Sequence, residues 1–317
     1  MEAKGSDGSS ARGAELSKCE DLWFDDGTIV LQAEQTLFRV YRGLLVQNSE
    51  IFADMFSLPT LNSGGGDLIE GCQVVFLHDT AQELTHFLKA IFVFGYAEKM
   101  LLTDRSFYLG ALKLSTKYSS QAIRRRIISE LSHIFPDTWS RFRTFDSWPT
   151  HQVFIQNVVL GAQLACLGQA RTLLPSALYC FTSLSTKMIF DQIFFSEKEK
   201  RQCVLGREAI IAEYKKLGNE LRNCRKSAPC DSRRYCPTLA GWPSLLAQER
   251  LLTRADAIAC PFILHESHDL IRDEGVCAAC YIKARQVYDE GRQRIWDGLP
   301  AYFEMESWEA LRRDTEY

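Results

Sequence analysis

Long apolar runs are missing from this sequence. No stretch of about 18 or more consecutive apolar residues occurs, and the first twenty residues have no apolar core. A membrane-spanning helix needs about 20 such residues, and a secretory signal peptide needs an apolar segment of about 7–15 residues. The sequence therefore predicts neither, and we expect a cytoplasmic or nuclear protein with no membrane partner.

An excess of basic residues is also missing. The 37 Lys and Arg residues are matched by 40 Asp and Glu residues, which gives a formal net charge of −3. Nucleic-acid-binding domains usually have a basic face and a high pI, so we expect no nucleic-acid partner. The short basic groups are dispersed, and solvated helix faces are favoured for Arg124 to Arg126, Lys215-Lys216, Arg233-Arg234 and Arg312-Arg313.

Motifs of common enzyme classes do not occur. The sequence has neither a Gly-x-Ser-x-Gly nucleophile elbow nor a Gly-rich dinucleotide fingerprint. The run Gly64 to Gly66 is not followed by the Gly-Lys-Ser or Gly-Lys-Thr of a phosphate-binding loop. His265 and His268 do not have the spacing of the zinc-protease helix. We therefore expect a protein that is not an enzyme and has no cofactor.

Cysteine, in contrast, is plentiful, with 11 residues. Without a signal peptide, reduced thiols are expected instead of a disulfide framework. A zinc site or a thiol-dependent domain is the alternative, although only one Cys-x2-Cys pair is present. Small buried side chains at a helix contact are the other interpretation of that pair. The candidate zinc ligands are Cys236, Cys260, Cys277 and Cys280.

Composition and periodicity divide the chain into five segments. Residues 1–20 are rich in Gly and Ser and have Leu16 as the one large aliphatic residue, too little apolar surface to offset the ordering entropy. They are predicted to be a disordered tail. A mixed segment of strands and helices over 21–135 precedes a helical domain over 136–223. An irregular Cys-containing connection with a short helix follows over 224–275, and then a C-terminal helix and tail over 276–317.

The most informative stretch joins a strand directly to an amphipathic helix. Phe38 and Val40 fall on one face of the strand, while Leu37 and Arg39 fall on the other. From Leu44 the period becomes helical, which predicts a single helix with one core-facing stripe. This arrangement is typical of a binding module and not of an active site. The stripe contains Leu44, Leu45, Asn48, Phe52, Met55 and Phe56.

The other elements of the mixed segment also have clear signals. Leu22 to Phe24 and Thr28 to Ala33 are predicted to pair as a hairpin with Asp26-Gly27 as its turn. Val74 to Leu77 is a further strand. Thr80 and Glu83 then form a capping-box pattern at the start of a helix, and two more helices are predicted over Phe107 to Tyr118 and Ser120 to Phe135.

After Pro136 the pattern is entirely helical. Ser196 and Glu199 form a second capping-box pattern, and Pro175 is compatible with the first turn of its helix. The predicted helices are Asp137 to Phe145, Gln152 to Leu167, Leu173 to Ser183, Ser196 to Asn223 and about Val276 to Asp297. The whole chain is therefore predicted to be α+β, with the strands confined to the N-terminal half.

Several residue runs resemble the BTB (POZ) domain, specifically the BTB proteins of mushroom-forming fungi (Agaricomycetes). The resemblance covers nearly the whole chain after residue 20. Its carriers are Asp26-Gly27, Phe38 to Arg42, Ser49 to Pro59, Leu77 to Thr80, Phe87 to Ala90, Leu114 to Tyr118 and Arg124 to Ile128, with Leu173 to Tyr179 and Arg294 to Pro300 in the C-terminal half.

This resemblance implies a small sheet capped by helices over 21–135, and a function in self-association or partner recruitment. It implies a homodimer, with Leu22, Trp23 and Phe24 as candidate exposed anchors because aromatic residues dominate interface hot spots. Asp26 and Arg42 match the positions of a charged pocket near the family's dimer interface. The alternative is an exposed turn Asp and an exposed helix-start Arg, because buried charges persist only when they are paired.

A second function that the resemblance permits is that of a cullin-type ubiquitin ligase substrate adaptor. Such adaptors extend the BTB domain with a paired helix, and the segment His133 to Pro136 is a weak candidate for it. The partners expected from the sequence are therefore proteins: a second copy of the chain and, in the adaptor alternative, a cullin.

Overall fold

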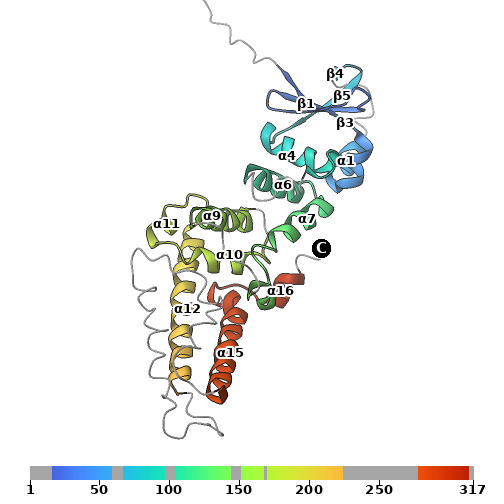
Figure 1. Cartoon of the computed structure of the whole chain (residues 1–317). Coiled ribbons are helices and arrows are strands. Elements are labelled where there is room, and N and C mark those ends of the chain that lie inside the picture. Colours follow the sequence, from blue (N-terminus) through green and yellow to red (C-terminus); the bar gives the residue numbers. More distant parts are fainter. Residues whose placement is uncertain are drawn as a thin grey trace, which may run out of the picture. The chain divides into compact units, whose positions relative to one another are not determined.

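The structure is a computed structural model that describes residues 16–58, 67–96, 105–143, 151–167, 170–223 and 278–313. It is mixed α+β, with a five-stranded sheet near the N-terminus followed by helices, as Figure 1 shows. The chain divides into two units, residues 1–124 and residues 125–317. The predicted α+β class is therefore confirmed.

The sheet of the N-terminal unit has the strand order β1-β3-β2-β5-β4. β2 and β3 form an antiparallel hairpin, β5 runs parallel to β2, and the short β4 pairs antiparallel with β5. These pairings bring β1 to β3 and the later strands β4 and β5 into one sheet. The strands are β1 Ser17–Trp23, β2 Ile29–Ala33, β3 Thr36–Val40, β4 Leu68–Ile69 and β5 Cys72–Leu77.

The predicted hairpin between Leu22–Phe24 and Thr28–Ala33 is wrong. A turn does form at Asp26-Gly27, where the Gly27 N–H donates to the Phe24 carbonyl, but β1 pairs in parallel with β3. A turn signal predicts a change of direction and does not decide which strand is the neighbour. β1 also begins at Ser17, so residues 17–20, which were assigned to the disordered tail, belong to the sheet.

The single helix predicted from Leu44 is also wrong, because two helices occur there. α1 spans Arg42–Asn48 and α2 spans Glu50–Ser57, with Ser49 extended between them at φ −151° and ψ 119°. Leu45, Phe52 and Phe56 of the predicted stripe are buried. The change of direction at Ser49 leaves Leu44 exposed.

Helices α4 Ala81–Phe92, α6 Arg105–Lys117 and α7 Gln121–Leu131 follow the strands. The predicted cap at Thr80 is confirmed, since its Oγ1 accepts the Glu83 N–H at 3.2 Å. α4 and α6 pack closely because Gly110 has no side chain; a Cβ there would lie 3.0 Å from the Glu83 Cα. The predicted apolar residues Leu84, Phe87 and Leu88 are buried.

The described part of the C-terminal unit is helical. Its helices are α8 Trp139–Arg143, α9 His151–Leu167, α10 Leu174–Phe181, α11 Thr186–Phe190, α12 Glu197–Asn223, α15 Ala278–Tyr302 and α16 Trp308–Arg313. The long helices α12 and α15 lie side by side (Figure 1), and Gly291 of α15 makes room for Leu217 of α12, since a Cβ on Gly291 would be 2.3 Å from the Leu217 Cδ1.

The capping box predicted at the start of α12 is confirmed in both directions. Ser196 Oγ accepts the Glu199 N–H at 3.3 Å, and the Glu199 carboxylate accepts the Ser196 N–H at 2.7 Å. This reciprocal pair satisfies two donors that a helix start leaves without intrahelical partners.

The last predicted helix was expected to end near Asp297, but α15 continues to Tyr302 with Pro300 inside it. Proline has no N–H, so the carbonyl four residues earlier loses its helical donor. That carbonyl belongs to Trp296, and it accepts the indole N–H of Trp308 at 3.0 Å instead. A side chain from α16 therefore supports the helix across its proline.

Trp296 is also the centre of the aromatic core of this unit. Its ring lies 4.6 Å from that of Phe142, 6.1 Å from Trp139 and 5.7 Å from Trp308, measured between ring centroids. Trp296 and Phe142 are buried. Helices α8, α15 and α16 thus meet on one set of aromatic side chains.

Candidate functional site

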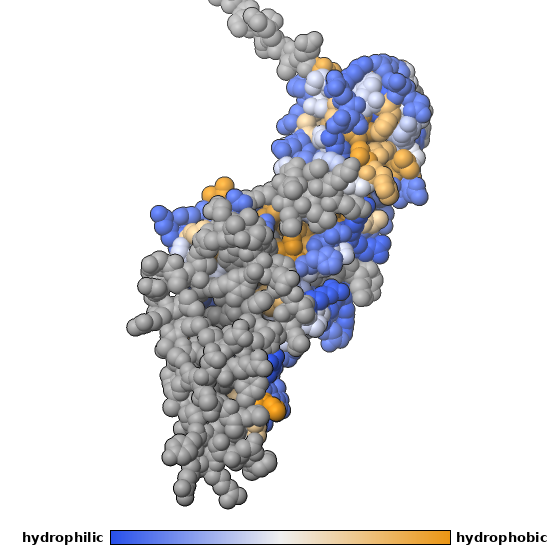
Figure 2. Space-filling model, viewed as in Figure 1, coloured by the Kyte–Doolittle hydropathy of each residue, from blue (hydrophilic) through white to orange (hydrophobic). Residues whose placement is uncertain are grey.

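Exposed apolar side chains mark the helix pair α1 and α2 of the N-terminal unit. Leu44 and Val46 lie on α1, Ile51 lies on α2, and Leu58 follows α2. Their exposed fractions are 40%, 39%, 39% and 53%. We call these four residues the α1–α2 surface. In Figure 2 hydrophobic residues gather on part of the visible face of the N-terminal unit, between hydrophilic ones.

Ser49 sets the angle between the two helices that carry this surface. It is buried, and its Oγ accepts the Phe52 N–H at 3.1 Å, which caps α2. The same hydroxyl donates to the carbonyl of Tyr118 at 2.6 Å. The extended backbone of Ser49 ends α1, while its side chain caps α2 and bonds to the end of α6.

Arg42 and Asp26, predicted to form a charged pocket, have different partners. A terminal guanidinium nitrogen of Arg42 donates to the carbonyl of Phe56 at 2.6 Å, and this bond satisfies a carbonyl at the end of α2. Asp26 accepts the Tyr41 hydroxyl at 2.6 Å, which raises the pKa of Tyr41. Both charged residues are exposed, as the alternative interpretation of an exposed turn Asp and an exposed helix-start Arg predicts.

The three predicted anchors occupy different positions. Leu22 is fully buried, so its assignment as an exposed anchor is wrong. Trp23 is half-buried and packs against the apolar cluster of Val30, Leu37, Cys72 and Val74, with Lys18 Nζ 4.3 Å from its ring centroid. Phe24 is half-buried and stacks on Tyr41 at 5.1 Å. Alternation along β1 turns Leu22 into the core and leaves Trp23 at the surface.

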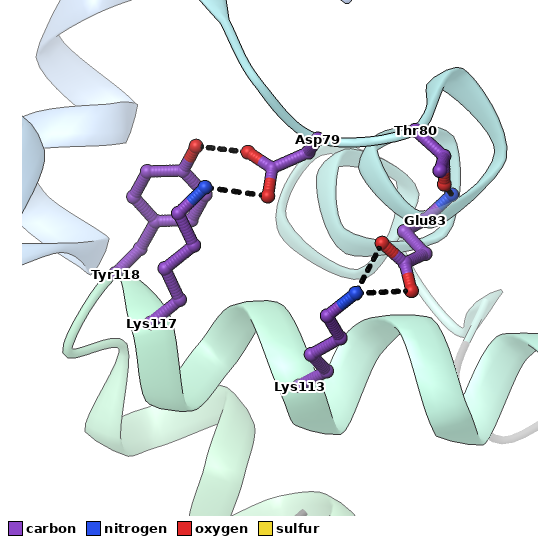
Figure 3. Close-up of polar contacts among 6 residues, drawn as sticks. All are labelled: Asp79, Thr80, Glu83, Lys113, Lys117 and Tyr118. Atoms are coloured by element: carbon purple, nitrogen blue, oxygen red, sulfur yellow. Dashed lines mark hydrogen bonds and ion pairs between the residues drawn. The ribbon is translucent and has the colours of Figure 1, made fainter.

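A polar network around the buried side chain of Asp79 adjoins α2, and sequence reasoning did not find it. Asp79 is buried and accepts two donors, Lys117 Nζ at 2.6 Å and the Tyr118 hydroxyl (Figure 3). The Tyr118 ring stacks on Phe52 of α2 at 4.6 Å. Burial, followed by the hydrogen bond to Asp79, raises the pKa of Tyr118 above its ordinary range.

A second ion pair in Figure 3 joins α4 and α6. Glu83 of α4 accepts Lys113 Nζ of α6 at 2.8 and 2.9 Å. This carboxylate was predicted to complete the Thr80 capping box, and it binds Lys113 instead. Together these contacts join α4 and the preceding Asp79 to α6, and Tyr118 to α2. No sequence spacing could have shown this, because Asp79 and Tyr118 are 39 residues apart.

The predicted zinc and thiol residues lie mostly outside the described chain. Cys236, Cys260 and Cys277 are outside it, and of Cys280 only the backbone, in α15, is described. The residues of the segment 224–275 and the Gly64 to Gly66 run are likewise outside. Within the described ranges, no group of three or more His, Cys, Asp and Glu side chains could hold a metal ion.

The described cysteines of the C-terminal unit have the properties of structural thiols. Burial raises the pKa of Cys203 to about 12, and burial together with Glu199 raises that of Cys166. Reactive cysteines need a lowered pKa because the thiolate is the nucleophile. Neither thiol therefore supports nucleophilic chemistry.

Among the helices that the structure describes, none has the length and apolar character to cross a membrane. Comparisons of the chain with protein-family models, curated proteins and solved structures gave no match.

Proposed function

We propose that the N-terminal unit is a BTB-type protein-interaction module through which the chain self-associates. The arrangement of its elements supports this proposal. The hairpin β2–β3, the helix pair α1–α2, the parallel strand β5 and the helices α4 and α6 follow the order that the sequence resemblance implies. No catalytic arrangement among the described residues competes with this interpretation.

The observation that carries the proposal is the α1–α2 surface. Four apolar side chains on or beside two short helices remain exposed although the unit buries Leu45, Phe52 and Phe56 on the inner side of the same helices. Burial of apolar area contributes about 25 cal/mol per Å², and stable obligate dimers bury more than about 2,000 Å² in total. A second copy of the chain would cover these side chains and remove them from water.

Sedimentation analysis of the purified chain tests this proposal. The monomer mass is 36.2 kDa, and we expect a species of twice that mass at micromolar concentration. The double variant Leu44→Asp/Ile51→Asp should sediment as a monomer, because it places charges in the proposed interface. Phe190→Asp, which adds a charge at an exposed apolar position of the C-terminal unit, is the matched control and should leave the mass unchanged.

Two results would contradict the proposal. A monomeric wild-type chain would contradict self-association itself. A dimer that persists in Leu44→Asp/Ile51→Asp would contradict the assignment of the interface to α1 and α2.

The cullin-adaptor alternative has less support. Its candidate segment His133 to Pro136 contains Phe135, which is buried in the C-terminal unit against Gly161. A Cβ at Gly161 would lie 2.1 Å from the Phe135 ring, so the two are in direct contact. Phe135 is thus part of a core and is not presented to a partner. A pull-down of a cullin with the purified chain tests this alternative, and specific binding would support it.

A further inference from the structure

We propose that an aromatic surface of the N-terminal unit binds an arginine side chain of a partner protein. Three rings from three elements form this surface: Phe24 follows β1, Tyr41 is the N-cap residue of α1, and Phe92 ends α4. All three are half-buried, and we call them the aromatic platform. This inference is independent of the self-association proposed for the α1–α2 surface.

The rings of the aromatic platform contact one another. The centroid of the Phe24 ring lies 5.1 Å from that of Tyr41 and 5.8 Å from that of Phe92, and the last two are 6.3 Å apart. Because each ring touches the other two, no gap between them could enclose a bulky cation such as a methylated ammonium. A flat cation that stacks on the exposed part of the rings fits this arrangement, and a guanidinium is such a cation.

Two carboxylates lie beside the aromatic platform. Asp25 and Asp26 are exposed in the turn that follows Phe24, and neither forms an ion pair with a residue that the structure describes. Asp26 Oδ1 accepts the Tyr41 hydroxyl at 2.6 Å, which leaves further acceptor positions on this carboxylate. Guanidinium pairs with carboxylates through parallel hydrogen bonds. The charge beside the rings is therefore complementary to arginine.

The neighbouring cations of the chain itself are directed elsewhere. Arg42 follows Tyr41, but its guanidinium donates to the Phe56 carbonyl at 2.6 Å and lies 5.3 Å from the Phe56 ring centroid. Lys89 of α4 pairs with Asp21 at 2.6 Å. Within the described ranges, no lysine or arginine lies over a ring of the aromatic platform. The cation that these rings attract would come from another molecule.

The turn that carries the two carboxylates is held at both ends. The Phe24 N–H donates to the Arg39 carbonyl at 2.9 Å, and the Thr28 N–H donates to the Val40 carbonyl at 2.9 Å. Within the turn, the Gly27 N–H donates to the Phe24 carbonyl at 2.9 Å. Groups that are already positioned lose less entropy when a ligand binds.

Exposed apolar residues continue from the aromatic platform. Val93 and Phe94 directly follow Phe92, and their exposed fractions are 38% and 101%. Grouped exposed apolar residues are typical of interaction sites. They would contact an apolar residue next to the arginine, so the partner segment that fits has an arginine with an apolar neighbour.

Saturation-transfer difference NMR with the full chain tests the proposal. The probe is the acetylated and amidated peptide Gly-Leu-Arg-Leu-Gly, and two more peptides have citrulline or lysine in place of the arginine. Citrulline has the shape of arginine without the charge, so its peptide should bind about 10-fold more weakly. The lysine peptide should bind about three-fold more weakly, because an ammonium has no flat face to stack. Absence of saturable binding by the arginine peptide, or equal binding of the citrulline peptide, would overturn the proposal.

Carboxylate variants separate this site from general electrostatic attraction. Asp25→Asn/Asp26→Asn keeps residues that suit a turn and should weaken binding of the arginine peptide about 5–10-fold, while it leaves the citrulline peptide within about two-fold. Asp54→Asn/Asp67→Asn is the matched control, since it removes two exposed carboxylates, on α2 and before β4. It should change the affinity by less than about two-fold. Equal effects of the two variants would overturn the proposal.

Phe24→Leu tests the ring. Leucine keeps an apolar contact and removes the aromatic face, so binding of the arginine peptide should weaken about three- to ten-fold. Phe190→Leu, at an exposed position of the C-terminal unit, is the control and should leave binding unchanged. Thermal melting checks that Phe24→Leu folds, and the carboxylate variants decide the question if it does not. Unchanged affinity in a folded Phe24→Leu variant would overturn the proposal.

Discussion

The two units of this chain differ in how many large apolar side chains they expose. Most of the large apolar side chains that are exposed in the described chain belong to the N-terminal unit: Leu16, Leu44, Val46, Ile51, Leu58, Leu68, Phe76, Val93 and Phe94. The described part of the C-terminal unit contributes Phe190, Ile193 and Ile282. Exposed apolar residues in groups are typical of interaction surfaces. The contrast is the reason for proposing self-association through the N-terminal unit.

The interiors differ as well. The C-terminal unit is built around Trp296 and its aromatic neighbours, whereas the N-terminal unit places a charged pair and a tyrosine, the Asp79–Lys117–Tyr118 network, between its helices. Aromatic contacts tolerate small shifts, while hydrogen bonds require fixed angles and distances. A polar network thus specifies the arrangement of the elements that it joins more strictly.

The largest effect is expected from Trp296→Ala. This substitution removes the centre of the aromatic core and should lower the free energy of unfolding of the C-terminal unit by about 3–5 kcal/mol. Urea denaturation followed by circular dichroism measures the loss. Phe190→Ala, an exposed aromatic residue of the same unit, is the control and should stay within about 0.5 kcal/mol. A loss of under about 1 kcal/mol for Trp296→Ala would show that this cluster is not the core.

Tyr118→Phe should have the next largest effect, in the N-terminal unit. It removes a buried hydrogen bond to a carboxylate, which contributes about 1.5–3 kcal/mol. Tyr41→Phe removes the corresponding bond to Asp26 at an exposed position and should cause a smaller loss. If both substitutions had the same effect on urea denaturation, the network would have no special role in this unit.

The same tyrosine predicts a dependence on alkaline pH. Because the folded state raises the pKa of Tyr118, the folded chain holds this proton at pH values where the unfolded chain releases it. Its contribution to stability is therefore complete below about pH 10 and decreases as the pH rises further. Denaturation curves from pH 9 to pH 11 should show a smaller decrease for Tyr118→Phe than for the wild-type chain. Parallel curves would contradict this assignment.

Helix caps provide a test in which the two units should behave alike. Thr80→Ala in the N-terminal unit and Ser196→Ala in the C-terminal unit each remove the oxygen that accepts a helix N–H, at a cost of about 1 kcal/mol. Differential scanning calorimetry should show the loss in the transition of the unit that carries the substitution. Equal shifts of both transitions would show that the units unfold together.

The smallest effect on stability is expected from Leu44→Asp/Ile51→Asp. Exposed substitutions away from special features usually change the free energy of unfolding by less than about 0.5 kcal/mol. The variant should keep a cooperative urea transition while it loses the ability to self-associate. A large loss of stability in the monomer would show that these residues belong to the fold and not to an interface.

Much of the fold could be predicted because the signals are local. The cap at Thr80 and the capping box at Ser196 and Glu199 are set by residues three positions apart, and both occur as predicted. The alternation of Phe38 and Val40 into the core is equally local. For the candidate site, Trp23 and Phe24 are half-buried, so part of each side chain lies at the surface as predicted. The predicted exposure of Leu22 and the predicted charged pocket of Asp26 and Arg42 do not occur. Their environment depends on strands that pair across the sheet.

The sequence by itself determined where most helices and strands of the described chain form, because side-chain period and helix caps act within a few residues. Tertiary structure decided the pairing of β1 with β3, the break at Ser49, and the continuation of α15 through Pro300. Each depends on a partner in another helix or strand: Arg39, Tyr118 and Trp308. A side chain or carbonyl that needs a hydrogen bond can take it from any segment that folding brings near, and local sequence does not specify which one.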